Sequence, residues 1–212
     1  MKNKLFAIFS LFALLSNIAS GAVLNLSNNG ANPTQLNFTA GENIVEVRLD
    51  PTSGADSRFF TFNIANGYQL DTIQLDAFSY TQIASNPIAT GVAFFGLKKG
   101  TTISPSNTDP TVVDGYALLG TPVSNNPING VIPTDVGGNV YTSLIATGAF
   151  TGNQLPNALG TGAYTVWLRE SRTIDEFSLN FKVAAVPLPG AVWLMGSVLM
   201  TFWGCGIRKK FV

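Results

Sequence analysis

Between residues 22 and 186 the chain is divided into short stretches in which apolar and polar side chains alternate. In Ile44–Leu49, for example, Val45, Val47 and Leu49 share one face, and Glu46 and Arg48 lie on the other. A period of two residues is typical of β-strands with one buried face, because successive side chains in a strand point to opposite sides. Patterns of this kind predict seven further strands, at residues 59–64, 68–78, 92–97, 116–119, 141–146, 164–168 and 177–183.

Residues typical of turns separate the predicted strands, among them Asn66-Gly67, Lys99-Gly100 and Asp114-Gly115. Residues 101–112 and 120–139 are rich in Pro, Asn, Thr and Gly, and we expect them to form long surface loops. Between the two ends of the chain, no segment repeats its apolar residues with a sustained helical period. The pattern therefore predicts an all-β fold, a single antiparallel β-sandwich of the jelly-roll type, and leaves the order of the strands open.

The first 21 residues have the three-part layout of a secretory signal peptide. Lys2 and Lys4 form a basic start, residues 5–15 are apolar apart from one serine, and small residues follow at 19–22. The alternative is a permanent membrane anchor. However, the 11 residues of the apolar run span only about 16 Å as a helix, whereas the core of a bilayer is about 30 Å thick. We expect residues 1–21 to be removed and residues 22–186 to form an exported domain.

The last 26 residues form a second apolar segment with a basic end. Pro187 and Pro189 precede an uncharged run, Ala191 to Ile207, which reaches the lower length limit of a membrane-spanning helix. The run is followed directly by a basic cluster, Arg208, Lys209 and Lys210. Such clusters stay on the cytoplasmic side of a membrane, which agrees with export of the preceding domain. The alternative, a buried core helix, requires a polar face, and the run offers only one serine and one threonine.

The sequence Val186-Pro187-Leu188-Pro189, the helix start AVWLMGS and the basic cluster together resemble the PEP-CTERM sorting tail of exported bacterial proteins. Leu188 stands where that family usually has a glutamate, so the position of the cut near this motif stays open. The resemblance implies recognition by an exosortase, a membrane enzyme that removes the tail near the Pro-x-Pro. It also implies a Gram-negative host that makes extracellular polysaccharide, and hence a place at the cell surface or in a biofilm matrix.

A looser resemblance concerns the domain itself. Turns and strand edges at residues 41–43, 56–62, 67–70, 162–168 and 177–181 are similar to those of bacterial pre-peptidase C-terminal (PPC-type) domains. These domains are β-sandwiches, so the resemblance supports the predicted fold. It implies no activity, because one fold serves many functions.

Charge and composition narrow the chemistry of the middle segment. Five of the 12 basic residues lie in the two ends and all 12 acidic residues lie between them, which leaves seven basic side chains in residues 22–186. The resulting net charge of about −5 argues against a nucleic-acid partner, which needs a basic surface. The chain has no histidine, and its one cysteine, Cys205, lies in the C-terminal run. Disulfides, His/Cys zinc sites and Cys–His or Ser–His catalytic pairs are therefore excluded from this segment.

One candidate metal site follows the first predicted strand. The segment from Asp50 to Asp56 combines two carboxylates with hydroxyls and backbone carbonyls, which are the ligands that Ca²⁺ prefers. The spacing is not that of an EF-hand, and Arg58 follows closely. A structural calcium ion is therefore one interpretation, and ordinary turn carboxylates are the other.

Two further features bear on a ligand or a reaction. The predicted turn between the last two strands is surrounded by three acidic residues, Glu170, Asp175 and Glu176. Paired carboxylates hydrolyse glycosidic bonds, but three acids at a hairpin tip are typical of a solvated turn, and we expect no catalytic residues here. Trp167 is the one tryptophan outside the C-terminal run. It is the candidate for a platform that stacks on a sugar, and the alternative is packing in the core or on a sheet face.

Together these features predict an exported, non-enzymatic extracellular protein that the C-terminal helix holds for a time at the inner membrane. Its expected partners are the secretion machinery with its signal peptidase, an exosortase and, by resemblance, extracellular polysaccharide. No cofactor is expected apart from the candidate calcium ion. Two other classes stay open. A carbohydrate-binding or adhesive module needs exposed aromatic side chains, and a hydrolase needs convergent carboxylates in a cleft.

Overall fold

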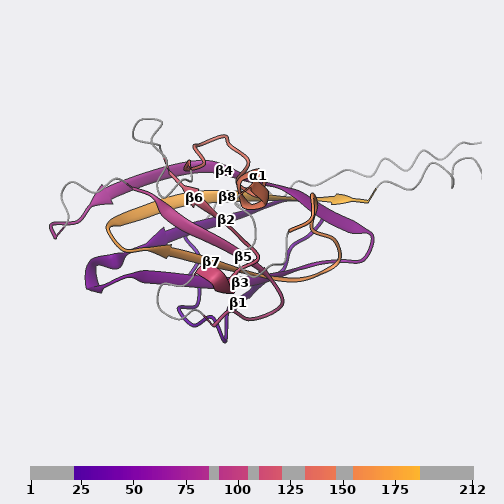
Figure 1. Ribbon diagram of the computed structural model, residues 1–212, viewed down its shortest axis with the longest axis horizontal. Helices are drawn as coiled ribbons and strands as arrows, with labels where there is room; N and C mark the ends of the chain where they lie inside the picture. Colours follow the sequence, from indigo (N-terminus) through magenta and orange to yellow (C-terminus); the bar gives the residue numbers. More distant parts are fainter. Residues whose placement is uncertain (1–21, 86–90, 105–109, 121–131, 147–154, 187–212) are drawn as a thin grey trace, which may run out of the picture.

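The computed structural model describes residues 22–85, 91–104, 110–120, 132–146 and 155–186. In chain order their elements are β1 (Thr34–Leu36), β2 (Gly41–Leu49), η1 (Pro51–Ser53), β3 (Asp56–Ile64), β4 (Tyr68–Gln82), β5 (Ala93–Lys99), η2 (Pro110–Val112), β6 (Gly115–Leu119), α1 (Val140–Ala146), β7 (Gly162–Glu170) and β8 (Thr173–Ala185). The fold is mostly β, as predicted, and the strands lie in two layers (Figure 1).

One sheet has five strands in the order β1-β3-β7-β5-β6, and the other has three in the order β2-β8-β4. Among the described strands, neighbours are antiparallel with one exception: β1 runs parallel to β3 over three residues. The chain changes sheet at each connection from β1 to β5 and again between β7 and β8. These crossings bring the inner faces of the two sheets against each other.

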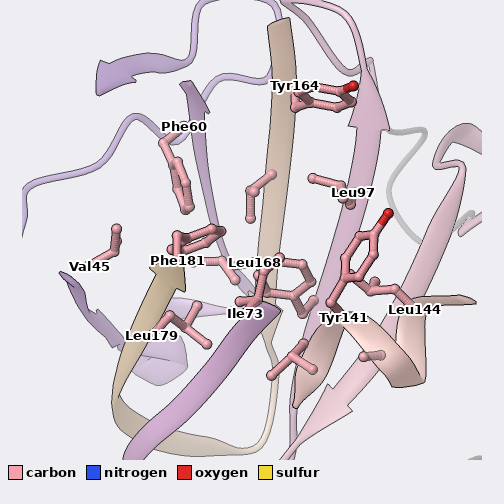
Figure 2. Packing of buried hydrophobic residues seen from close by; sticks show 14 of the residues in the cluster. Val45, Phe60, Ile73, Leu97, Tyr141, Leu144, Tyr164, Leu168, Leu179 and Phe181 are labelled. Carbon is pink, nitrogen blue, oxygen red and sulfur yellow. The ribbon is translucent and has the colours of Figure 1, made fainter. Parts of the chain in front are cut away.

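The main core lies between the sheets and consists of the side chains that alternate inward along the strands. Phe60 and Phe62 of β3 and Phe181 of β8 are fully buried. The ring centroid of Phe181 lies 5.9 Å from that of Phe60 and 5.5 Å from that of Phe62. Figure 2 shows Phe60 and Leu168 of the larger sheet in the same buried space as Leu179 and Phe181 of the smaller one. Each of these side chains contributes about 1.5–3 kcal/mol through its burial.

Seven of the eight predicted strands are present, and most are longer than predicted. The exception is residues 141–146, which belong to helix α1, so the predicted strand there was wrong. Tyr141 and Leu144 are buried on one side of α1, at a spacing that a short helix accommodates. Oδ1 of Asn139 accepts the backbone N–H of Tyr141 at 3.0 Å, as a helix N-cap does. The same oxygen accepts the N–H of Ile73 in β4 at 3.2 Å, which ties the helix to the sheet edge.

The described domain ends where β8 ends. Tyr68 is paired with Ala185, and the backbone N–H of Val186 donates to the carbonyl of Gly67 at 2.9 Å. Within the described ranges there is no helix long and apolar enough to span a membrane. The predicted signal peptide (1–21) and the predicted tail from residue 187, including the run Ala191 to Ile207, lie outside those ranges.

Candidate functional site

The outward face of the five-stranded sheet carries a second apolar cluster, separate from the core between the sheets. Phe59 of β3 and Trp167 of β7 are opposite each other in the strand register, and their rings stack with centroids 6.1 Å apart. Gly96 of β5 follows in the same row. Ile103, which follows β5, and Val113, which precedes β6, are fully buried in this cluster. The chain around these two residues therefore covers part of the outward face.

Beside this cluster lies a hollow of about 620 Å³, which we call the outer-face hollow. The apolar part of its lining consists of Phe59, Ile103 and Trp167, which are at most 2% exposed, and of the exposed Ala31 and Ala55. Its polar lining consists of Asn28, Asn29, Ser57, Ser104 and Arg169. The volume falls within the usual range for small-ligand sites, and the mixed lining offers both apolar contact and hydrogen bonds.

The N-terminal segment is held against this face by a close approach at Gly30. The backbone N–H of Ile103 donates to the carbonyl of Gly30 at 2.9 Å, and that of Phe59 donates to the carbonyl of Ser27 at 2.7 Å. A Cβ atom at residue 30 would collide with the carbonyl oxygen of Ile103, so only glycine fits without a shift. Gly30 itself is one of the residues that line the outer-face hollow.

Trp167 does not present an open ring face. Its side chain is 2% exposed, its ring meets that of Phe94 edge-on with centroids 4.9 Å apart, and Nε1 donates to Oγ of Ser57 at 3.3 Å. The structure therefore has the sheet-face tryptophan that was the second interpretation of the sequence, and not an exposed stacking platform. Ile103 supplies part of the cover, and a residue so distant in sequence gives no local signal of it.

Arg169 is the charged side chain of the outer-face hollow. It is half-buried near the end of β7, and alternation places it on the same outward side as Trp167. Among the described residues it has no ion pair, and none of the described lining residues is acidic. Its positive charge is therefore not neutralised by those residues. Sequence reasoning missed Arg169, although its spacing of two residues from Trp167 was a usable signal.

Asp50 and Asp56 lie close together, but arginines and the loop occupy their oxygens. Oδ1 of Asp56 is 3.0 Å from Nε of Arg58, and Oδ2 accepts the backbone N–H of Asp50 at 2.8 Å. Oδ1 of Asp50 accepts the hydroxyl of Thr52 at 2.8 Å, and Oδ2 is 3.2 Å from Nη2 of Arg48. Thr52 and then Arg48 lower the pKa of Asp50. No group of three or more acidic, histidine or cysteine side chains in the described part could hold a metal ion.

Glu170 and Asp175 are buried, contrary to the expectation of a solvated turn, and are 6% and 0% exposed. The turn between β7 and β8 joins two different sheets, so these side chains point into the end of the core. Glu176, the next residue, is exposed and forms an ion pair with Arg48. The expectation of a solvated turn holds only for Glu176.

The two buried carboxyls have displaced pKa values. Burial raises the pKa of Asp175 to about 7; the hydroxyl of Thr173, which donates to Oδ1 at 2.6 Å, opposes the shift, and the charge of Glu170 adds to it. Burial also raises the pKa of Glu170, against the backbone N–H groups of Ser171 and Arg172, which donate to it at 2.7 and 2.6 Å. Neither carboxyl lines the outer-face hollow. We therefore regard the pair as a structural feature of the turn.

Of the predicted sorting motif, the described residues include only Val186, which is 45% exposed. Outside them lie Pro187, Leu188, Pro189 and the basic cluster Arg208, Lys209 and Lys210. A scan against protein-family models and searches of curated proteins and of solved structures found no match to this chain. The resemblance of the tail to PEP-CTERM segments therefore stays a prediction from the sequence.

Proposed function

We propose that this chain is an exported, non-enzymatic extracellular protein whose C-terminal tail is a substrate of an exosortase. The supporting observation is that main-chain hydrogen bonds of the two-sheet domain reach almost to both proposed cuts. Near its start the N–H of Leu24 donates to the carbonyl of Glu46 at 3.0 Å, and at its end the N–H of Val186 donates to the carbonyl of Gly67 at 2.9 Å. Both proposed cuts fall just outside these hydrogen bonds, so processing would leave the two-sheet domain whole.

The chemistry of the tail supports the same proposal. Pro187 and Pro189 fix their own backbone and disfavour helix in the residues before them, which keeps the chain extended where a protease must grip it. The uncharged run from Ala191 to Ile207 would hold the protein at the inner membrane, with Arg208 and its basic neighbours on the cytoplasmic side. After the cut, the domain would be released or attached at the cell surface.

In this proposal the two sheets form a jelly-roll-like antiparallel sandwich that is stable outside the cell without a disulfide. The buried clusters on both faces of the five-stranded sheet provide the stability that smaller secreted domains obtain from disulfides. The expected partners are signal peptidase with the secretion machinery, an exosortase, and the polysaccharide of the cell surface or biofilm matrix. The carboxylates of Asp50 and Asp56 are already paired with arginines, which supports a role in the loop without calcium.

Intact-mass measurement of the protein secreted by its native host tests the proposal. We expect a mass that begins near Ala22 and ends near Pro187–Pro189. Replacing both prolines with alanine should leave the tail attached and the protein in the membrane fraction. The matched control is Pro156→Ala, an exposed proline of the described domain, which should be processed normally. A protein found in the cytoplasm with both ends uncut would refute export and sorting together.

A second function, a carbohydrate-binding or adhesive module, is favoured by one observation. The outer-face hollow combines buried aromatic side chains with amide, hydroxyl and guanidinium groups on a sheet face that lies outside the main core. This arrangement replaces the exposed ring of Trp167 as the basis for that function. It also suggests which class of sugar the hollow would take.

A further inference from the structure

We propose that the outer-face hollow binds a carboxylated sugar, such as a uronic acid unit of an acidic polysaccharide, and that Arg169 holds the carboxylate. The proposal rests on the proposed export, because such a polysaccharide lies outside the cell. The binding itself, however, is a property of the outer-face hollow and is measured independently of export.

The charge of the hollow matches a single negative group. Arg169 contributes one positive charge, and no acidic side chain is present among the described lining residues. A guanidinium group binds a carboxylate through two parallel hydrogen bonds, which makes arginine a strong carboxylate receptor. An amino acid ligand would leave its ammonium group without a carboxylate partner in this lining. These features favour a monoanion over a zwitterion.

The N-terminal loop argues against a phosphate. Phosphate sites usually gather several backbone N–H groups or more than one cation around the anion. In the loop that borders the hollow, the N–H of Asn29 donates to Oγ of Ser27 at 3.1 Å, and the N–H of Ala31 donates to Oδ1 of Asn29 at 2.9 Å. These two N–H groups are therefore already used inside the loop. The described lining leaves Arg169 as its one full positive charge, which suits a carboxylate.

The rest of the lining suits a sugar ring. The amide of Asn28 and the hydroxyls of Ser57 and Ser104 both donate and accept hydrogen bonds, as sugar hydroxyls do. The apolar surface that a ring can reach comes mainly from Ala31 and Ala55, because Phe59 and Trp167 also line the hollow but are each only 2% exposed. An aliphatic carboxylate such as a fatty acid would leave these amide and hydroxyl groups unpaired when it displaced their water.

The two outward sheet faces differ in charge. Along the described strands of the five-stranded sheet, alternation places two charged side chains on the outward face, Lys98 and Arg169, and both are basic. Along β2 and β8 of the other sheet, the outward positions include three acidic and two basic side chains, Glu42, Glu46, Glu176, Arg48 and Lys182. An acidic polymer would therefore approach the face that carries the hollow, despite the negative charge of the domain.

Titration calorimetry of the full-length chain in neutral detergent tests the proposal, with trigalacturonic acid as the probe. The control ligand is the fully methyl-esterified form of the same trisaccharide, which keeps the ring and hydroxyls and removes the charge. We expect the acid to bind at least about 10-fold more tightly than the ester, because hydrogen bonds to charged groups are worth more than neutral ones. Acetate at the same concentration should not displace the acid.

Two arginine variants separate the site from general charge. Arg169→Gln should weaken binding of the acid by about 10- to 100-fold and leave binding of the ester nearly unchanged. Arg172→Gln makes the same change in net charge at an exposed position in the turn after β7 and should bind both ligands as the unchanged chain does. Arg169→Lys keeps the charge but cannot form the two parallel hydrogen bonds. Its preference for the acid over the ester should therefore lie between that of the unchanged chain and that of Arg169→Gln.

Several outcomes would overturn the proposal. Equal affinity for acid and ester would show that the carboxylate is not recognised. Displacement of the acid by an equal concentration of acetate would show that the sugar ring is not recognised. Equal losses in the Arg169 and Arg172 variants would reduce the effect to net charge. Circular dichroism checks that each variant is folded. If Arg169→Gln does not fold, Arg169→Lys replaces it as the test: a ratio of acid affinity to ester affinity equal to that of the unchanged chain would then refute the proposal. Failure of export would appear in the mass measurement and leave these binding results unaffected.

Discussion

Replacing Asp175 with asparagine should make the protein more stable at alkaline pH and remove much of its pH dependence. Asp175 is fully buried, and its pKa rises from an ordinary value of 3.8 to about 7 in the folded protein. The unfolded chain therefore loses this proton near pH 4, and the folded protein keeps it up to about pH 7. In that window the folded state binds more protons, so the free energy of unfolding falls as the pH rises.

The size of the effect follows from the shift. A displacement of about three pH units, at about 1.4 kcal/mol per unit, costs the folded protein up to about 4 kcal/mol above pH 7. An asparagine side chain carries no charge, its oxygen can still accept the hydroxyl of Thr173, and its amide can donate to Glu170. We therefore expect the free energy of unfolding of Asp175→Asn to be about 2–4 kcal/mol higher than that of the unchanged protein at pH 8. At pH 4 the two values should agree within about 1 kcal/mol.

Urea unfolding, followed by the fluorescence of Trp167, measures how the free energy of unfolding changes with pH. The secreted protein is unfolded at half-unit steps from pH 4 to pH 8. The matched control is Glu176→Gln, which removes an exposed carboxylate from the adjacent residue and should change the free energy of unfolding by less than about 1 kcal/mol. If the unchanged protein shows no decline between pH 5 and pH 8, or if Asp175→Asn declines as steeply, the reasoning about this buried carboxyl is incorrect.

Two further predictions concern contacts that hold the outer-face hollow and the helix. Gly30→Ala should lower the free energy of unfolding by about 1–3 kcal/mol, because its Cβ collides with the carbonyl of Ile103, whereas Gly160→Ala meets no atom within 4 Å and should be near neutral. Asn139→Ala should cost about 1–2 kcal/mol through loss of the helix cap and its bond to β4, with the exposed Asn63→Ala as control. Urea unfolding measures both pairs, and equal effects within a pair would contradict the stated cause.

The strands were predictable where one face of the strand is buried and the other is not. Residues 45–49 and 177–183 show this clearly, because apolar side chains return at every second position and face the core. The helix at residues 141–146 was not predictable, because a segment of six residues fits either the helical or the strand period. The hydrogen bonds of Asn139 to Tyr141 and Ile73 select the helix, and the second of these depends on a strand that lies far away in the chain. Strand β1 has three residues, too few for a pattern.

The candidate site was predicted only in part. Trp167 was identified as a residue of interest, but its cover by Ile103 and its neighbour Arg169 follow from how distant segments meet on the outward sheet face. The acidic residues of the last turn show the same limit. A hairpin within one sheet would expose them, whereas the passage from β7 to β8 between sheets buries Glu170 and Asp175.

By itself the sequence determined that residues 22–186 are rich in strands, which side chains of most strands face inward, and that the two ends differ from the middle in length, charge and hydropathy. These properties depend on neighbours along the chain. Only the tertiary structure decided which sheet each strand joins, which outward side chains are covered and which charges are left unpaired. These properties depend on contacts between residues that are distant in sequence, and the alternation of side chains along a strand does not specify its partners.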